Sequence, residues 1–254
     1  MLEAGVVYAF LGVDSVVEKD LILFNKGYTS DVVYKNLDLL LKLGYSIDVD
    51  SKHRLSVGYI TWQPYSTIEG IKESVKFFKM YNNTPKLIQH ELMLFSSTPL
   101  MEKIKSDGLL VSEKLAPNEF TFNWKFKDKE LEILYRQMLN YFAEWSPIRD
   151  GIRTLEKFIY MESPNLKGTI NDLVIIRKKL DKHFYEFFDM LLMEYGGVRS
   201  RISNITKEYI HQIEGFLTKN AIDKIDRFCI DNGFETNIVD GIREKQLWLC
   251  RYRS

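Results

Sequence analysis

The chain has 254 residues, of which 45% are apolar and 28% charged, so we expect a globular protein of one large domain or two small ones. Basic and acidic residues both total 35, and this balance argues against a nucleic-acid-binding protein. No apolar run approaches the roughly 20 residues that a membrane helix needs, and the first residues lack a secretory signal pattern, so a cytoplasmic protein is expected.

A strand, a short polar turn and an amphipathic helix recur three times within residues 1–115. Apolar strands are predicted at 6–11, 55–60 and 91–95. Consecutive units of this kind form parallel strands joined by right-handed crossovers, and ligands of such sheets bind at the carboxyl ends of the strands. Because three units cannot close a barrel, we predict an α/β fold in which residues 1–115 form a partial (half) βα barrel.

The helices that follow these strands carry start and stop signals. Residue types that cap helix N-termini stand before the second, third and fourth helices, and glycines stand where the helices are expected to end. The expected starts are Thr29 or Ser30, a capping box from Ser66 to Glu69, and Thr98 ahead of Pro99; the expected ends are Gly27, Gly44 and Gly108.

The pattern changes near residue 116, and we predict a second, mainly α-helical domain over 116–254. Residues 120–126 alternate with a period of two, which fits an extended segment, and Asp128 opens a largely helical region. The aromatic side chains of 184–188 fit helix packing better than a cofactor site, and residues 246–253 alternate like a last strand. Helix breaks are expected near Ser146-Pro147, Ser163-Pro164 and Gly196-Gly197.

Cysteine and histidine are sparse and scattered. Cys229 and Cys250 have no neighbouring cysteine or histidine, so we expect two reduced core thiols. The four histidines show no metal-ligand spacing such as His-x-x-x-His, and an intrinsic metal site is not expected.

Three blocks of sequence resemble the second half of the radical S-adenosylmethionine (SAM) barrel. They are Gly12-Val13-Asp14-Ser15 with Asn25-Lys26-Gly27, then 57–71, then 91–103 with its Ser-Thr-Pro-Leu helix start. In this order they look like the family's fourth-, fifth- and sixth-strand blocks, closest to the branch that often carries a cobalamin-binding domain. Two features depart from the family: its cluster-binding Cys-x-x-x-Cys-x-x-Cys is absent, and Asp14 stands where Glu or Gln is usual.

The resemblance implies SAM as a cofactor. A [4Fe-4S] cluster, and possible use of cobalamin, would depend on an N-terminal half that these residues do not include. It also implies a partner, which is an N-terminal half-barrel in another chain or in a missing segment, or a second copy of this chain, together with a small-molecule or peptide substrate. Three parallel strands alone would leave sheet edges and one sheet face uncovered, which independently favours a partner or the chain's own C-terminal helices as a cover.

Four candidate cofactor-binding residues lie at the exits of the first two strands. Asp14 and Ser15 follow the first strand, and Trp62 and Gln63 follow the second. A carboxylate at this position can accept charge-assisted hydrogen bonds from the SAM ammonium or ribose hydroxyls. Three of them have a structural alternative: Asp14 as a helix N-cap, Gln63 as a turn residue and Trp62 as a packing residue. Lys26 is expected to be a solvated cation at a helix end.

The sequence thus predicts the C-terminal portion of a radical SAM enzyme, inactive without the cluster-binding half. A degenerate, non-catalytic relative that binds a partner is the alternative. A third possibility is a self-contained α/β enzyme with carboxylates at the strand exits, although no paired acid and base stand at an informative spacing. The substrate and the reaction type do not follow from the sequence.

Overall fold

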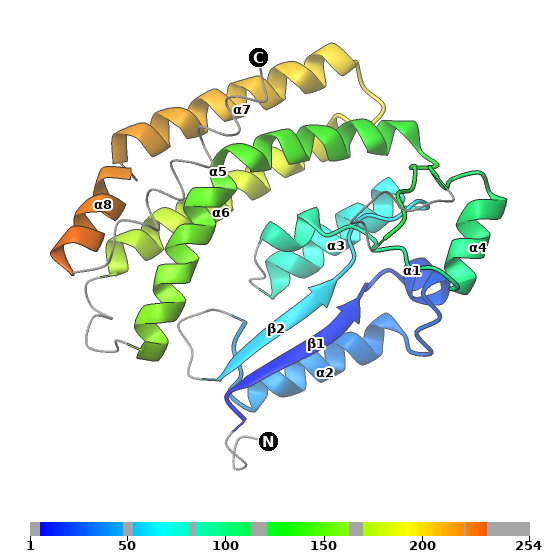
Figure 1. The fold of residues 1–254 in the computed structure, drawn as a ribbon, viewed down its shortest axis with the longest axis horizontal. Coiled ribbons are helices and arrows are strands. Elements are labelled where there is room, and N and C mark those ends of the chain that lie inside the picture. Colours follow the sequence, from blue (N-terminus) through cyan, green and yellow to red (C-terminus); the bar gives the residue numbers. More distant parts are fainter. Residues whose placement is uncertain are drawn as a thin grey trace. The chain divides into compact units, whose positions relative to one another are not determined.

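The computed structural model describes residues 6–47, 53–81, 85–112, 121–162, 170–220 and 222–232 (Figure 1). The chain divides into two compact units, Met1–Ile133 and Leu134–Ser254. The first unit is α/β, and the described residues of the second form helices joined by turns. The units divide later in the chain than the predicted domain limit at 115/116, because residues 121–126 pack against the first unit.

The first unit is built on two parallel strands, β1 (Tyr8–Asp14) and β2 (Arg54–Tyr59). Leu11 lies opposite Val57, and the register shifts between Gly12 and Asp14, at the carboxyl end of β1. Side chains of β2 alternate between buried and half-buried, as they do in a sheet that is covered on one face. These two predicted strands are therefore confirmed.

The four helices predicted for this unit are present. They are α1 (Glu18–Leu23), α2 (Ser30–Lys42), α3 (Ile68–Met80) and α4 (Pro99–Ser106), with a short 3-10 helix, η1 (Pro85–Gln89), between the last two. The helix ends at Gly44 and Gly108 follow the prediction, because both glycines take the positive φ that ends a helix, at 94° and 69°.

Two of the predicted helix starts differ in detail. Thr67, rather than Ser66, caps α3, and its hydroxyl accepts a hydrogen bond from the Gly70 amide at 3.2 Å. Ser66 Oγ instead accepts from the Gln63 amide. Thr29 makes no side-chain cap at α2, where the Glu18 carboxylate accepts from the amide of Ser30 at 2.7 Å.

The face of β2 that carries Leu55, Val57 and Tyr59 is buried. The Tyr59 ring stacks on Phe77 of α3 at 5.6 Å and meets Phe78 edge-on at 4.7 Å. Helix α3 therefore covers this face through aromatic contacts.

The opposite face of the sheet is more open. Phe10 is 64% exposed, and its ring lies over Gly58, where an added Cβ would come within 2.7 Å of the ring. A glycine is required at this point of β2 for the aromatic ring to lie flat against the strand.

The third predicted strand, 91–95, is not a regular strand in the described residues. It forms two isolated bridges, one parallel from Glu91 to Trp62 and one antiparallel from Leu94 to Phe122. Beyond the bridge at Glu91, the carbonyl of Leu92 accepts from the indole N–H of Trp124, which is a side-chain donor and not part of a strand ladder. Among the described residues the regular sheet thus has two strands rather than three, and a partial barrel is not confirmed.

Residues 91–95 nevertheless form a compact core with the helix that follows them. Its members are Leu92, Leu94, Met101, Ile104 and Phe122. The extended segment expected at 120–126 contributes bridges at Phe122 and Trp124 only.

The second unit consists of long helices. They are α5 (Lys129–Glu162), whose first residues belong to the first unit, α6 (Asn171–Met193), α7 (Arg199–Asn220) and α8 (Ile222–Asp231). The predicted break at Gly196-Gly197 is confirmed between α6 and α7. The break at Ser146-Pro147 is wrong, because α5 runs through it. The predicted features at Ser163-Pro164 and 246–253 lie outside the described residues.

An aromatic core explains why α5 continues past a proline. Tyr141, Phe142 and Trp145 on α5 pack against Phe184 and Phe187 on α6, and all five are essentially buried. The packing of this apolar face outweighs the hydrogen bond that proline removes from a helix. The expectation that the aromatics of α6 form core is thereby confirmed.

None of the helices in the described residues is both long and apolar enough to cross a membrane. Cys229 on α8 is buried, as expected, and Cys250 lies outside the described part of the chain.

Candidate functional site

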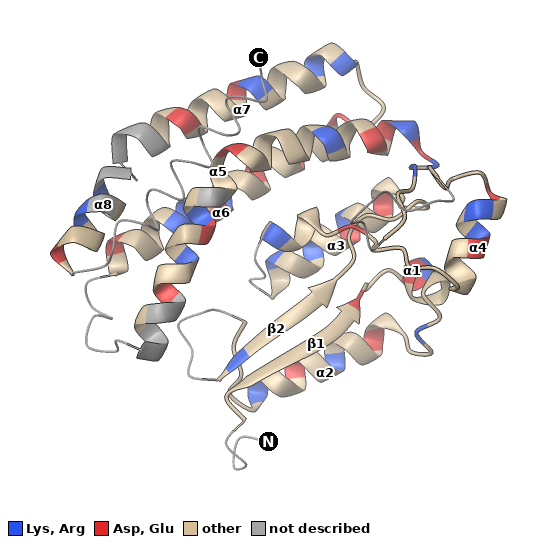
Figure 2. Cartoon of the chain, in the orientation of Figure 1, with Lys and Arg blue, Asp and Glu red and all other residues tan. Residues whose placement is uncertain are grey.

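The carboxyl end of β1 presents an ion pair. Asp14, the last residue of the strand, has a φ of 60°, which is uncommon for a residue other than glycine. Its carboxylate pairs with the ammonium of Lys26, and the two side chains are 24% and 29% exposed. The partnership with Asp14 raises the pKa of Lys26. In Figure 2 the strands are almost free of charge, with red at the carboxyl end of β1.

This pairing changes two of the expectations from sequence. Asp14 is not an N-cap, because α1 begins at Glu18 after Val17, which makes no side-chain cap. Lys26 is not a solvated cation, because the turn after α1 brings its ammonium back to the end of β1. The carboxylate and the ammonium both stay partly accessible to solvent.

Ser15 and Gln63 both donate hydrogen bonds to Asp20, a residue that the sequence analysis did not single out. Ser15 Oγ donates to one carboxylate oxygen of Asp20 at 3.1 Å, and Gln63 Nε2 donates to the other at 3.0 Å. Ser15 is fully buried and Gln63 is 1% exposed. Asp20, on α1, thus joins the exit of β1 to the exit of β2.

Burial is the dominant influence on the Asp20 carboxyl. It raises the pKa of Asp20 from 3.8 to about 6, although the hydrogen bonds from Ser15 and Gln63 act in the opposite direction. The nearby Glu73 carboxylate contributes a smaller rise. No sequence pattern singles out Asp20, because an acidic residue in the first turn of a helix is common for its effect on the helix dipole.

Gln63 and Trp62 make further hydrogen bonds within the first unit. Gln63 Oε1 accepts from the amide of Tyr65 at 2.7 Å, which is a turn contact. Trp62 is fully buried, packs edge-on against Phe126 at 6.0 Å and donates from its indole N–H to the carbonyl of Ile88. Of the four predicted site residues, only Asp14 presents a partly accessible charged group; a cofactor role for the four stays a prediction.

The third exit is open to solvent. Ser96 and Ser97 are exposed, and Ser97 has a φ of 61°. Two of the three non-glycine residues with positive φ in the described part of the chain lie at strand ends: Asp14 is the last residue of β1, and Ser97 follows the predicted strand 91–95 by two residues. Backbone strain of this kind clusters at functional sites, where the fold holds a side chain in place.

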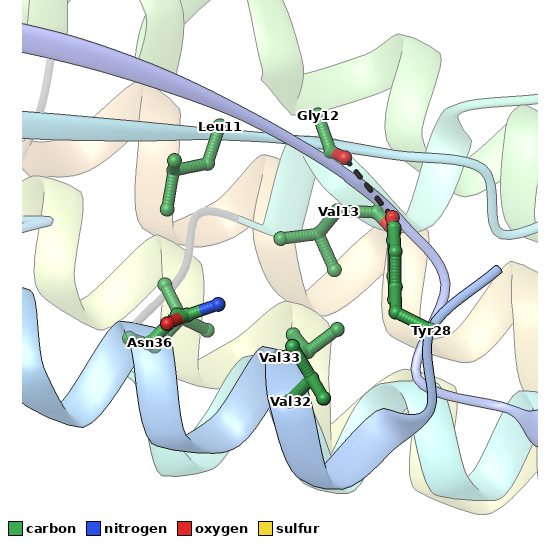
Figure 3. Close-up of a pocket in the computed structure, with 8 residues that line it drawn as sticks. Leu11, Gly12, Val13, Tyr28, Val32, Val33 and Asn36 are labelled. Atoms are coloured by element: carbon green, nitrogen blue, oxygen red, sulfur yellow. Dashed lines mark hydrogen bonds between the residues drawn. The ribbon is translucent and has the colours of Figure 1, made fainter. Parts of the chain in front are cut away.

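A cavity of about 170 Å³ lies between β1 and α2 (Figure 3). Tyr28 closes one end, and its hydroxyl donates to the carbonyl of Val13 at 3.1 Å. The cavity lies beside Val13, the neighbour of Asp14, but neither Asp14 nor Gln63 lines it. The lining is Leu11, Gly12, Val13, Tyr28, Val32, Val33, Asn36 and Leu37.

The chain offers charged groups that suit SAM, but it lacks the thiolates that an iron–sulfur cluster needs. The accessible Asp14–Lys26 pair offers one anionic and one cationic group, which complements the ammonium and carboxylate of the methionine moiety of SAM. Three thiolates for an iron–sulfur cluster are not available, because the sequence has two cysteines and Cys229 is buried. In the described residues no group of three or more His, Cys, Asp or Glu side chains is placed to hold a metal ion.

Comparison with known proteins finds solved structures with a similar fold but no matching sequence. No family model matches the chain, and no curated protein sequence matches it either. Three solved structures of the cobalamin-dependent S-adenosylmethionine radical enzyme OxsB share its fold. The structure with aqua-cobalamin and S-adenosylmethionine bound has a TM-score of 0.61 at 13% identity and covers 94% of this chain. The structure with aqua-cobalamin has a TM-score of 0.54 at 14% identity, and the apo structure 0.56 at 13%.

The likeness covers almost all of this chain but less than half of each OxsB chain. This chain spans only 38–42% of the length of the OxsB chains. The likeness covers nearly all of this chain, so it includes the second unit, which the sequence resemblance does not place. The chain therefore has a fold similar to part of a cobalamin-dependent radical SAM enzyme.

Proposed function

We propose that this chain contributes SAM-positioning and substrate-pocket residues to a radical SAM enzyme whose cluster-binding portion lies outside these 254 residues. The observation that carries the proposal is the coincidence of two independent features. The fold is similar to OxsB over 94% of the chain, and the one accessible charged pair of the β1 exit stands where such sheets bind ligands.

Asp14 and Lys26 are the residues that would hold SAM. The Asp14 carboxylate accepts from the SAM ammonium or a ribose hydroxyl, and the Lys26 ammonium attracts the SAM carboxylate. The positive φ of Asp14 holds its carboxylate at the carboxyl end of β1. The hydrogen bonds of Ser15 and Gln63 to Asp20 join the segments that follow β1 and β2. SAM, when bound, supplies the carbon-radical chemistry of the enzyme class.

No reaction step is assigned to a cluster on this chain. The buried Cys229 and the lack of a third cysteine do not fit a [4Fe-4S] site. In our proposal the cluster, and cobalamin if it is used, are held by the N-terminal half-barrel.

Saturation-transfer NMR with SAM tests the proposal, because it detects weak complexes of the kind that half of a site would form. We expect transfer to the methionine and ribose protons of SAM with the unmodified chain. Asp14→Asn should weaken binding by about tenfold, the order of one charge-assisted hydrogen bond. Asparagine tolerates positive φ, so the backbone of the exit should persist.

Asp31→Asn is the matched control, because Asp31 is an exposed carboxylate on α2 with the same charge. It should bind SAM as the unmodified chain does. Absence of transfer to SAM with the unmodified chain, or equal loss in both variants, would contradict the assignment. That result would favour the alternative, a non-catalytic relative that binds a partner, for which the exposed apolar surface of the first unit is the supporting feature.

A further inference from the structure

A buried group of charged side chains joins α5 to α6 in the second unit, and the proposed function uses none of it. Arg149 of α5 is fully buried and donates to Asp181 of α6 at 2.6 Å and to Asp150 at 2.9 Å. Arg177 of α6 donates to Asp181 at 3.1 Å and to the fully buried Glu156 at 2.8 Å. Asp181 therefore links the two guanidiniums into one network.

Two donors beside this network are unused within the described part of the chain. Arg149 Nη2 and the indole Nε1 of Trp145 are both buried and have no hydrogen-bond partner. A buried donor without an acceptor has given up its hydrogen bond to water, which costs free energy. Native proteins keep such a donor where a bound water molecule or an ion completes it. The pair of unused donors therefore points to a ligand.

The spacing along α5 adds a third donor group to these two. Trp145, Arg149 and Arg153 stand four residues apart, so they follow one another on neighbouring turns of one side of the helix. Arg153 is only partly buried and takes part in none of the ion pairs above. The row of side chains thus leads from unused donors in the core to a cation that solvent can reach.

The local charges favour a further negative group beside Arg153. The two guanidiniums of the network are matched by two carboxylates, those of Asp181 and Glu156. Burial lowers the pKa of Arg153, and the guanidiniums of Arg149 and Arg177 lower it further, each by more than Asp181 or Glu156 raises it. Asp150 is 34% exposed, so solvent screens its charge. The charge of Arg153 is therefore the one that the network leaves over.

The chemistry of the three groups selects an anion rather than a water molecule. Guanidinium and indole N–H groups donate hydrogen bonds and accept none. A water molecule among them would also have to place its own protons, for which these groups offer no acceptor. An oxyanion accepts several hydrogen bonds and has no such requirement, and guanidinium groups match the oxygens of carboxylate and phosphate in geometry and charge.

We propose that Trp145, Arg149 and Arg153 form a binding site for a small oxyanion group, a phosphate or a carboxylate. One oxygen of the anion accepts from Arg149 Nη2 and from the indole N–H of Trp145. The remaining oxygens face Arg153, past which the anion enters from solvent. The site lies wholly within the second unit, Leu134–Ser254, so the inference goes beyond the proposed function and does not depend on the assignment of SAM to Asp14.

Nuclear magnetic resonance of the indole N–H groups tests the site. The chain has four tryptophans, and Trp145→Phe identifies the signal of Trp145 by its loss. The unmodified chain is titrated with inorganic phosphate, and separately with acetate, at constant ionic strength. We expect a saturable shift of the Trp145 signal, because its N–H gains an acceptor. A response to phosphate, to acetate or to both supports the site and identifies the oxyanion that it takes.

Two arginine variants separate a built site from a general effect of charge. Arg153→Gln should weaken binding of the anion by about tenfold or more, the order of one charge-assisted hydrogen bond. Its fold should persist, because Arg153 holds none of the ion pairs of the network. Arg136→Gln is the matched control, because it removes the same charge from an exposed position of α5. It should bind the anion as the unmodified chain does.

Equilibrium dialysis with radiolabelled phosphate and acetate measures the same affinities without Trp145→Phe. Binding that Arg153→Gln weakens and Arg136→Gln preserves supports the site. Absence of a saturable shift and of retained label with both anions would overturn it, and the unused donors would then belong to a buried water molecule. Equal affinities of the two arginine variants would also overturn it. Neither result bears on SAM binding, which is tested separately at Asp14.

Discussion

At the residue scale, Asp20 couples the stability of the first unit to pH. Burial raises its pKa to about 6, so the folded state binds a proton more tightly than the unfolded state does. The stabilisation from this proton is complete below the unfolded pKa, near 3.8, and is lost as the pH rises through about 6. The difference corresponds to at most about 3 kcal/mol between these limits.

Asp20→Asn tests this coupling. The free energy of unfolding of the unmodified chain should fall between about pH 4 and about pH 7 relative to the variant, by roughly 1–3 kcal/mol. Urea titrations followed by circular dichroism at the two pH values measure the difference. Parallel pH profiles for the two proteins would show that Asp20 titrates normally.

The same residues show how far the candidate site can be predicted. Asp14 is predictable, because a polar residue after an apolar strand marks the carboxyl edge of the sheet. Its pairing with Lys26 is not, because twelve positions separate the two and only the turn after α1 brings them together. The contact of Asp20 with Gln63 joins helix α1 to the segment after β2, 43 residues further along the chain. A local sequence pattern does not predict a contact over this distance.

At the element scale, the caps of α2 and α3 provide a matched pair. The Thr67 hydroxyl accepts from the Gly70 amide, whereas Thr29 makes no side-chain cap. Thr67→Val should lower the free energy of unfolding by about 1 kcal/mol, the usual value of an N-cap. Thr29→Val should change it much less. Chemical denaturation of both variants measures the difference, and equal losses would show that the caps do not act as the hydrogen bonds imply.

The second unit depends on a buried ionic network between α5 and α6. Glu156 is fully buried and accepts from Arg177 at 2.8 Å, and Arg177 and Arg149 both contact Asp181. Glu156→Gln removes one of the two carboxylates that pair with the buried Arg177 guanidinium, so we expect a loss of about 3 kcal/mol.

Lys182→Gln is the control for this network, because Lys182 belongs to an exposed pair with Glu186 at 3.6 Å on the same helix α6. Exposed pairs contribute little to stability. Calorimetric unfolding of both variants distinguishes them; a similar midpoint for Glu156→Gln and the unmodified chain would show that the network is not stabilising.

Elements with strong periodicity are the predictable part of this fold. Helices α1–α4 and strands β1 and β2 follow from their apolar patterns and end signals. The strand expected at 91–95 is replaced by isolated bridges, and the Leu92 carbonyl accepts from the indole N–H of Trp124, 32 residues away. The break expected at Pro147 fails because apolar side chains on both sides of it are buried: Tyr141, Phe142 and Trp145 before it, and Ile148, Ile152 and Leu155 after it. In both places a distant contact outweighs a local preference.

At the scale of the whole molecule, the two units differ in how much of their fold the sequence reveals. The first carries the three blocks that resemble the radical SAM barrel, and the second carries none, although the fold likeness to OxsB covers 94% of the chain. Helix packing tolerates almost any combination of apolar side chains of suitable volume. A helical unit can therefore keep its fold at 13% identity without a motif that sequence reading could find.

The division of labour that we propose predicts the iron content of the isolated chain. Anaerobic reconstitution with iron and sulfide should leave it with no more metal than the Cys229→Ser/Cys250→Ser variant, because two thiols, one of them buried, cannot supply the three thiolates that the family uses. Iron and acid-labile sulfide assays after desalting measure this. A stoichiometric cluster in the unmodified chain that is lost in the variant would contradict the division, since the chain would then hold its own cluster. Equal, trace amounts in both proteins would support our proposal that the cluster is held outside these 254 residues.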